Sequence, residues 1–344
     1  MDKKVLNIMR RLELFEKRSR YSGDIELYLK IDVLASCLFH LGYMSIDEYN
    51  SLYKKIKKSW RYLIKALEQI EKAKIKDFVE HNHILLKMYW TLYKQYETQA
   101  IHYAEYNISS QNINQAIEEF FSMLNCRELY DELEITGRII RFDSKNDESW
   151  CVNDNGNSYL LLHNHPVNSS KYYTCLIHEM GHAYVNHILK ERANYCEYNI
   201  FIEVIPLLFE RLFHQFLYEN NFVSKDEYER IVLNFEANCR SQLKLGIISS
   251  EIIESGKYTL RGLKVTPKID CERDEELETI LSGIDIDCTP WLSLKWTYYI
   301  LGNIVSRKLF SEYQNDKNEF ILNLPELVKS FSSLNLDEMI DKYC

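Results

Sequence analysis

The chain has few of the residues that interrupt helices. Its 344 residues include only 10 glycines and 5 prolines, while apolar and charged types make up 46% and 27%. Because glycine and proline mark turns and break helices, their scarcity favours long helices over a turn-rich β architecture. The balance of apolar and charged residues is that of a globular protein rather than a disordered one. We therefore expect a mainly α fold.

Long apolar runs are also missing. No window approaches the roughly 18 uncharged apolar residues that suggest a transmembrane helix. The first residues, MDKKVLNIMRRLELFEKRSR, carry charge throughout and lack the apolar core of a signal peptide. We expect neither a membrane span nor a secretory leader.

The cysteines form no recognisable pairs. There are nine of them, scattered and odd in number, with no C-x-x-C spacing. Secreted disulfide frameworks and cysteine-rich zinc sites both need closely patterned cysteines. The pattern indicates reduced thiols and predicts a cytoplasmic protein.

The sequence has no excess of positive charge. Lys and Arg total 42 against 51 Asp and Glu, which gives a net charge of −9. A nucleic-acid-binding protein presents a surplus of Lys and Arg to the phosphates, so nucleic acid is not expected as a partner. The stretch Lys54–Lys76 is a local exception on an amphipathic helical pattern. A solvated helix face explains it best, and docking of an acidic partner is the alternative.

Apolar residues recur at helical spacing over most of the chain. The texture changes between Gly137 and His165, where β-branched and apolar runs broken by Asn, Asp and Gly predict two or three short strands. We expect two helical lobes, residues 1–125 and 126–344, with the small sheet in the second. Later helices are predicted over about 167–190, 199–220, 291–313, 324–329 and 336–343, with a loop-rich insertion over 250–290. Pro206 means that the second of these helices either starts late, near Ile202, or kinks.

The central motif is His178-Glu179-Met180-Gly181-His182. Residues four apart on a helix lie on one face, so the two imidazoles converge on one point and form a natural pair of zinc ligands. Glu179 stands beside them without being a ligand, which is the place of a general base. The alternative is that both histidines are buried core residues of the helix and bind no metal.

A catalytic zinc ion needs a third protein ligand and an open position for water. A further His is excluded, because the extended zincin pattern needs Gly and His where this chain has Val185 and Ile188. The third ligand is therefore expected to be a carboxylate of the next helix, and Glu203 is the first choice. Glu197 and Glu210 are rivals, and Glu210 is alternatively an acceptor for the N–H of a ligating His.

Several segments together resemble the thimet oligopeptidase and oligoendopeptidase F family of zinc peptidases. The resemblance implies one zinc ion per chain, held by His178, His182 and the Glu203 of a Phe-x-Glu motif. It also implies a tyrosine-rich helix in which the hydroxyl of Tyr299 polarises the scissile carbonyl. Core packing is the alternative for each tyrosine of this helix and is favoured for Tyr298. The similar segments are Phe142-Asp143, Ser149-Trp150-Cys151, Tyr159–Asn164, Leu176–Ala183, Phe201–Glu210, Trp296–Gly302 and Phe320–Asp337.

Two departures from the family pattern stand out. Members usually carry a glycine-rich loop with His and Tyr before the tyrosine helix, whereas Ser282–Lys295 contains no His, no Tyr and a single Gly. The chain is also much shorter than typical members. The resemblance therefore gives no expectation of how the substrate is clamped or of how long a peptide is accepted.

These features predict a zinc-dependent endopeptidase or oligopeptidase in which Glu179 assists the attack of water on a peptide bond. The peptide is expected to lie along Ser158–Asn164, as an added strand on an exposed sheet edge. Its substrates are either peptides in general or one dedicated partner peptide. A catalytically inactive peptide-binding or regulatory protein on the same scaffold is the alternative.

Overall fold

The computed structural model describes most of the chain from residue 110 onward. The described residues are 110–142, 149–154, 157–166, 169–189, 201–254, 290–331 and 336–343, with short pieces at 6, 9–14, 35, 38, 43–45, 47–48 and 51–52. The basic stretch Lys54–Lys76, Glu197 and the segment Ser282–Lys295 lie outside the described residues, apart from the first part of a helix that begins at Pro290. Most of the predicted N-terminal lobe lies outside them too, so the boundary near residue 125 stays a prediction.

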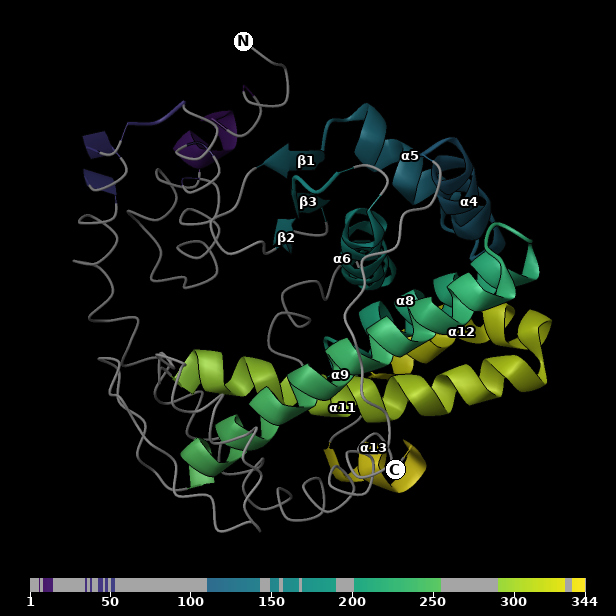
Figure 1. Cartoon of the computed structure of the whole chain (residues 1–344). Coiled ribbons are helices and arrows are strands. Elements are labelled where there is room, and N and C mark those ends of the chain that lie inside the picture. Colours follow the sequence, from purple (N-terminus) through teal and green to yellow (C-terminus); the bar gives the residue numbers. More distant parts are fainter. Residues whose placement is uncertain are drawn as a thin grey trace.

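Helices dominate the described part of the chain, as the low glycine and proline content predicts (Figure 1). Their bounds are α4 Ser110–Met123, α5 Arg127–Ile135, α6 Ser170–Ile188, α8 Val204–Glu219, α9 Lys225–Glu254, α11 Pro290–Asn315, α12 Lys317–Phe331 and α13 Leu336–Tyr343. The mainly α prediction is confirmed. None of the described helices is long and apolar enough to cross a membrane.

The small sheet has three strands, β1 Ile139–Phe142, β2 Trp150–Asp154 and β3 Asn157–His163, in the order β1-β3-β2. β1 runs parallel to β3 and β2 runs antiparallel to it. The prediction that Ser158–Asn164 offers an exposed edge is wrong, because β3 is the central strand and both of its sides are already paired. A continuous buried run such as 159–162 is typical of a central strand.

Local sequence signals explain where the two central helices begin. Ser169 caps α6 by accepting a hydrogen bond from the backbone N–H of Tyr172 at 3.3 Å. Pro206 is the third residue of α8, where the backbone N–H has no partner inside a helix, so the missing donor costs nothing there. The helix therefore starts late rather than kinking, which decides between the two predicted possibilities.

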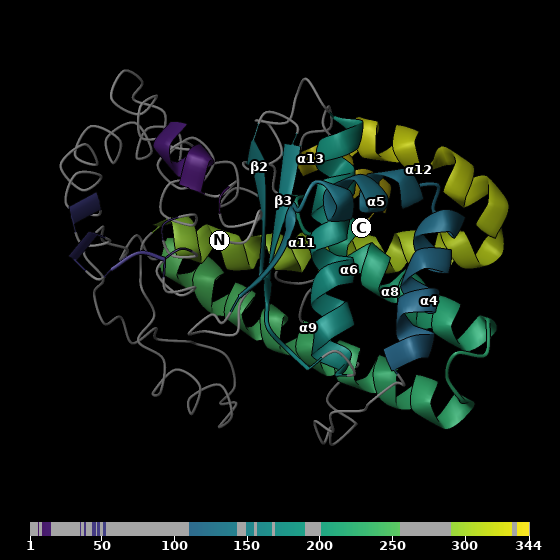
Figure 2. The same ribbon diagram turned by 90° about the horizontal axis from the view of Figure 1, so that it is seen from above.

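α8 occupies the centre of the hydrophobic core, with α6, α9 and α11 beside it (Figures 1 and 2). Phe120 of α4 packs edge-on against the rings of Phe209, Phe213 and Phe216 of α8, with centroid separations of 5.1–6.2 Å. A partly buried ion-pair cluster also holds the helices together. Glu236 of α9 pairs with Arg211 of α8 and Arg307 of α11, so these three helices are linked by charge as well as by apolar packing.

Candidate metal centre

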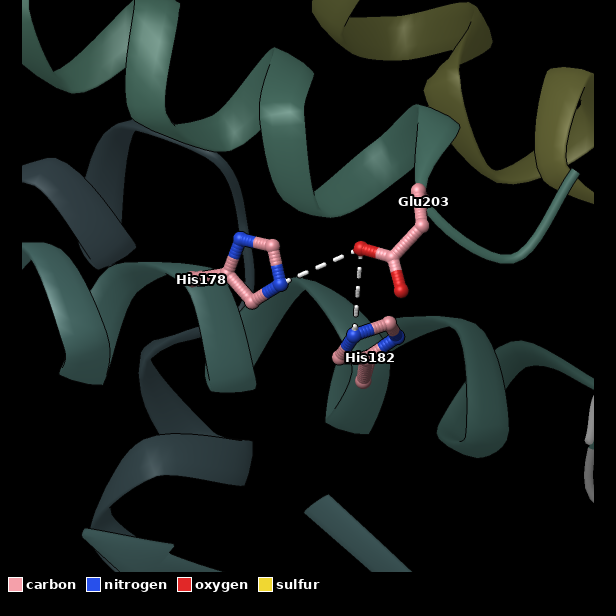
Figure 3. Close-up of side chains that lie close together, drawn as sticks. All are labelled: His178, His182 and Glu203. Atoms are coloured by element: carbon pink, nitrogen blue, oxygen red, sulfur yellow. Dashed lines mark ion pairs between the residues drawn. The ribbon is translucent and has the colours of Figure 1, made fainter. Parts of the chain in front are cut away.

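Two imidazoles one turn apart on α6 form the base of the site (Figure 3). The ring centroids of His178 and His182 lie 5.1 Å apart. Their side chains are 13% and 15% exposed. They are buried enough to be held in place and open enough to receive a ligand on one side.

Glu203 brings a carboxylate to both rings from the N-cap position of α8. Its Oε2 lies 3.2 Å from Nε2 of His178 and 3.8 Å from Nε2 of His182 (Figure 3). One ligand atom from each of the three residues lies within 4.8 Å of the others. Two imidazole nitrogens and one carboxylate oxygen are the donor set of a catalytic zinc site that keeps a position for water. The residues present therefore fit zinc.

Two glycines allow the helices to come this close. A Cβ added to Gly181 of α6 would lie 2.6 Å from Cα of Pro206 in α8. One added to Gly302 of α11 would lie 2.8 Å from Cβ of Glu203. Neither approach is possible with a larger residue unless backbone or a ligand side chain moves. Glycine in a helix interior costs about 1 kcal/mol relative to alanine, and here it permits the contact that places Glu203.

A second carboxylate of α8 reaches the far side of one imidazole. Oε1 of Glu210 lies 2.7 Å from Nδ1 of His178, and its side chain is 4% exposed. An Nδ1–H donated to Glu210 leaves Nε2 of His178 facing Glu203, which is the tautomer that a metal ligand needs. The sequence left this role open as an alternative for Glu210, and the contact favours it.

The carboxylates also shift the protonation of His178. Burial by itself lowers the pKa of this imidazole, but the hydrogen bonds and charges of Glu203 and Glu210 outweigh burial and raise the pKa well above its usual value. The two carboxylates therefore favour the protonated form of His178 when no metal is bound. A metal ion that takes Nε2 has to displace that proton.

The remaining predicted site residues are placed as follows. Glu179 lies on α6 between the two imidazoles in sequence and is 5% exposed. Tyr298 is buried, in keeping with core packing, and Tyr299 is half-buried against Leu207, Phe235 and Cys239. Catalytic roles for Glu179 and Tyr299 stay predictions.

Among solved structures, the chain matches that of a putative oligoendopeptidase F from Bacillus anthracis str. Ames. The TM-score is 0.52 at 12% sequence identity, and the match covers 91% of this chain. The chain has the fold of that oligoendopeptidase F. It spans 62% of the length of the oligoendopeptidase F chain. No protein-family model matches the sequence, and no curated protein matches it.

The contact between Gly302 and Glu203 was not predicted from the sequence. The signal was available in the sequence, because an interior helix glycine between Leu301 and Asn303 is as costly as Gly181. A glycine of that kind indicates close approach by another element. The sequence does not show which element makes this approach, and the structure identifies it as the start of α8.

Proposed function

We propose that this chain is a zinc-dependent peptidase that hydrolyses peptide bonds. The observation that carries the proposal is the convergence of His178, His182 and Glu203 in a chain with the oligoendopeptidase F fold. The donor set suits zinc, and two imidazoles with one carboxylate leave room for water and a substrate carbonyl. The similarity to a putative oligoendopeptidase F supports peptides as substrates.

His178, His182 and Glu203 hold the ion in this scheme, and Glu210 fixes the ring of His178. Bound zinc supplies Lewis acidity that lowers the pKa of water toward 7 and polarises a carbonyl. Glu179 takes the proton of the attacking water and returns it to the leaving amine. The hydroxyl of Tyr299 donates a hydrogen bond to the carbonyl oxygen, a contribution on the order of 10²–10³ in rate for such donors.

Because β3 is the central strand, we propose that the extended peptide pairs with β2 instead. Among the described strands β2 pairs only with β3, so its other side is an edge. Both strands lie beside α6 (Figures 1 and 2), and Nδ2 of Asn186 in α6 donates to Oγ of Ser158 in β3 at 3.1 Å. An extended peptide that adds to β2 would make backbone hydrogen bonds that do not read its sequence.

The deciding experiment is Glu179→Gln, with zinc content and cleavage of a mixed peptide pool followed together. We expect zinc to be retained and cleavage to fall by about 10²–10⁴-fold, because the proton acceptor is lost while the ligands remain. Glu229→Gln, an exposed glutamate of α9, is the matched control and should cleave normally. Undiminished cleavage by the Glu179 variant would remove this residue from the mechanism.

A catalytically inactive peptide-binding or regulatory protein is the second candidate. It is favoured by the segment Ser282–Lys295, which lacks the His and Tyr of the family loop. Wild-type protein that binds zinc and peptides but hydrolyses none of the pool would establish it. The same pool separates general turnover from processing of one dedicated peptide, because mass spectrometry of the products shows how many sequences are cut.

We place the protein in the cytoplasm on the chemistry of its thiols. None of the described cysteines forms a disulfide; these are Cys126, Cys151, Cys175 and Cys239. Burial raises the pKa of the Cys126 thiol to about 12, so this thiol stays protonated and unreactive. Free thiols are typical of a reducing compartment.

A further inference from the structure

Arg141, at the end of β1, has an unusual environment for a cation. Its guanidinium carbon lies 3.5 Å from the centroid of the Tyr172 ring on α6. Its Nη1 is buried and has no hydrogen-bond partner among the described residues. A buried guanidinium nitrogen that donates no hydrogen bond is costly, so the arrangement is completed by an acceptor.

The groups around Arg141 do not supply a buried counter-ion within the described structure. Burial lowers the pKa of the guanidinium, while Tyr172, Tyr130, Glu134 and Cys175 act in the opposite direction. Of these four, only Glu134 is a carboxylate, and it is exposed on α5. Stacking on Tyr172 offsets part of the cost of burying the charge, because a ring face attracts a cation. Among the described residues, Nη1 of the guanidinium has no carboxylate partner.

Arg141 lies beside the first turn of α6, the helix that carries two of the three grouped residues, because its guanidinium stacks on Tyr172. β1 and β3 are parallel, with Arg141 opposite Leu162, so both strands end at the same edge of the sheet. There the backbone N–H of His163 donates to Oγ of Ser149 at 3.0 Å. Cys175 of α6 hydrogen-bonds the same Ser149 and interacts electrostatically with both His178 and Arg141. The contacts thus run from Arg141 to the metal-binding face of α6.

The face of α6 that carries the metal group also carries a second cation. Lys171, Cys175, His178 and His182 follow one another at spacings of four, three and four residues, which puts them on one side of the helix. Lys171 is exposed. It lies seven residues before His178, about 10 Å along the helix axis at 1.5 Å per residue, and the neighbouring Tyr172 points to the adjacent side of the helix. Lys171 therefore stands at the N-terminal end of the face that holds the two histidines, and Arg141 lies beside it over the ring of Tyr172.

We propose that Arg141, together with Lys171, binds a carboxylate group of the peptide substrate. This inference rests on the proposed peptidase function and names its substrate class. A guanidinium fork matches a carboxylate in two parallel hydrogen bonds. The separation of about 10 Å between Lys171 and His178 along the helix corresponds to about three residues of extended chain at roughly 3.3 Å each. The favoured substrates are peptides with a carboxylate about three residues from the cleaved bond.

Two groups can supply that carboxylate, the C-terminus of a short peptide or an acidic side chain. The test uses one peptide with a free C-terminal carboxylate, the same peptide as its amide, and the amide with glutamate as its last residue. The ratio of kcat/KM between the peptides measures the preference. If the free-acid peptide alone is preferred, the carboxylate is terminal, and if the glutamate amide is preferred as well, a side chain serves.

Arg141→Gln should lower kcat/KM for the carboxylate peptide by about 10- to 100-fold and leave the plain amide nearly unchanged, because only the charged hydrogen bond is lost. Lys171→Gln, at an exposed position where folding is not at risk, should lower the same preference several-fold. Arg127→Gln is the matched control. Arg127 also lies near a tyrosine ring, at 5.8 Å from Tyr130, but it pairs with Glu118 and Asp131 on the surface, so the preference should stay.

Equal losses on all three peptides, or an unchanged preference in both variants, would overturn the proposal and leave Arg141 as a packing residue. A failure of the proposed peptidase function can be told apart from a failure of the carboxylate site. If zinc-loaded wild-type protein cleaves none of the peptides, their binding is measured by calorimetry instead. A weaker affinity of Arg141→Gln for the carboxylate peptide alone then supports the subsite, and equal affinities of the wild-type protein for all three overturn it.

Discussion

At the scale of single residues, the two carboxylates of α8 have separate positions around one imidazole. Glu203 approaches Nε2 of His178 and Glu210 approaches Nδ1. They are seven residues apart, so two helical turns bring both to the same side of α8. One helix can thus provide a ligand and also fix the ring of another ligand.

Replacing Glu210 by glutamine should weaken metal binding without removing a ligand. Glutamine keeps an acceptor near Nδ1 of His178, but the negative charge that makes the ring a better donor to the metal is lost. Such partners of ligating histidines contribute about 10- to 100-fold in affinity. Competition with a chelator for zinc measures the change. Glu219→Gln, at the exposed end of the same helix, should bind zinc as the wild type does, and equal affinities for both variants would show that Glu210 does not support the site.

Part of this arrangement could be predicted from the sequence and part could not. The pairing of His178 and His182 follows from helix geometry, because residues four apart lie on one face whatever the tertiary fold. The choice among Glu203, Glu210 and Glu197 depended on how a second helix crosses the first. Spacing alone does not determine a crossing, so Glu210 stayed open between rival ligand and hydrogen-bond acceptor until α8 was placed against α6.

At the scale of helices and strands, close crossings determine the site. α6 meets α8 at Gly181, and α11 meets α8 at Gly302, so each crossing brings backbone against backbone or against Cβ. Interiors packed to this density do not absorb a methyl group without a shift. The position of Glu203 is therefore set by α11, a helix that supplies none of the three grouped residues.

Gly302→Ala should displace Glu203 from the two imidazoles. The added Cβ would lie 2.8 Å from Cβ of Glu203 and 2.9 Å from Cδ1 of Leu207. Overpacking of this kind costs about 1–3 kcal/mol, and we expect weaker zinc binding as well as a lower free energy of unfolding. Urea unfolding of the metal-free protein and zinc competition measure the two effects. Ser311→Ala on the exposed side of α11 is the control, and a Gly302 variant with unaltered zinc affinity would contradict the role given to this crossing.

The strands show what the sequence does not reveal at this scale. Two or three strands and their approximate positions followed from β-branched runs and turn residues, and the described part of the chain has three there. Their order did not follow, because alternation and burial describe the faces of a strand and not its neighbours. The sequence hint that β3 is central was its continuous apolar run at 159–162. The structure buries this run on both faces of the sheet.

At the scale of the whole molecule, the core around α8 contains a charged side chain, Arg211, and a titratable imidazole, His214. Arg211 of α8 pairs with Glu236, and its guanidinium carbon lies 4.7 Å from the Phe235 ring centroid. His214, one turn before the end of α8, packs edge-on against the same ring at 5.1 Å. Burial, with the charge of Arg211 adding to it, lowers the pKa of His214 to about 3.

This imidazole makes the stability of the fold depend on pH in a defined window. Its folded pKa of about 3 is below the ordinary value of 6.5, so the unfolded chain binds more protons between these values. The stabilisation is complete above pH 6.5 and is lost as the pH falls toward 3, at no more than about 1.4 kcal/mol per pH unit. His178 acts in the other window, because its raised pKa stabilises the metal-free fold at low pH and the effect is lost as the pH rises above 6.5.

His214→Gln should flatten the fall in stability between pH 6.5 and 4. The glutamine does not titrate, so the unfolded variant has no extra proton to take up at this position. Urea unfolding of the metal-free wild type and variant at several pH values gives the two slopes, and the carboxylates contribute equally to both. His214→Phe keeps a ring against Phe235 and should give the same reduced slope if glutamine disturbs the packing. Parallel wild-type and variant slopes would mean that His214 is already open to protons in the folded chain.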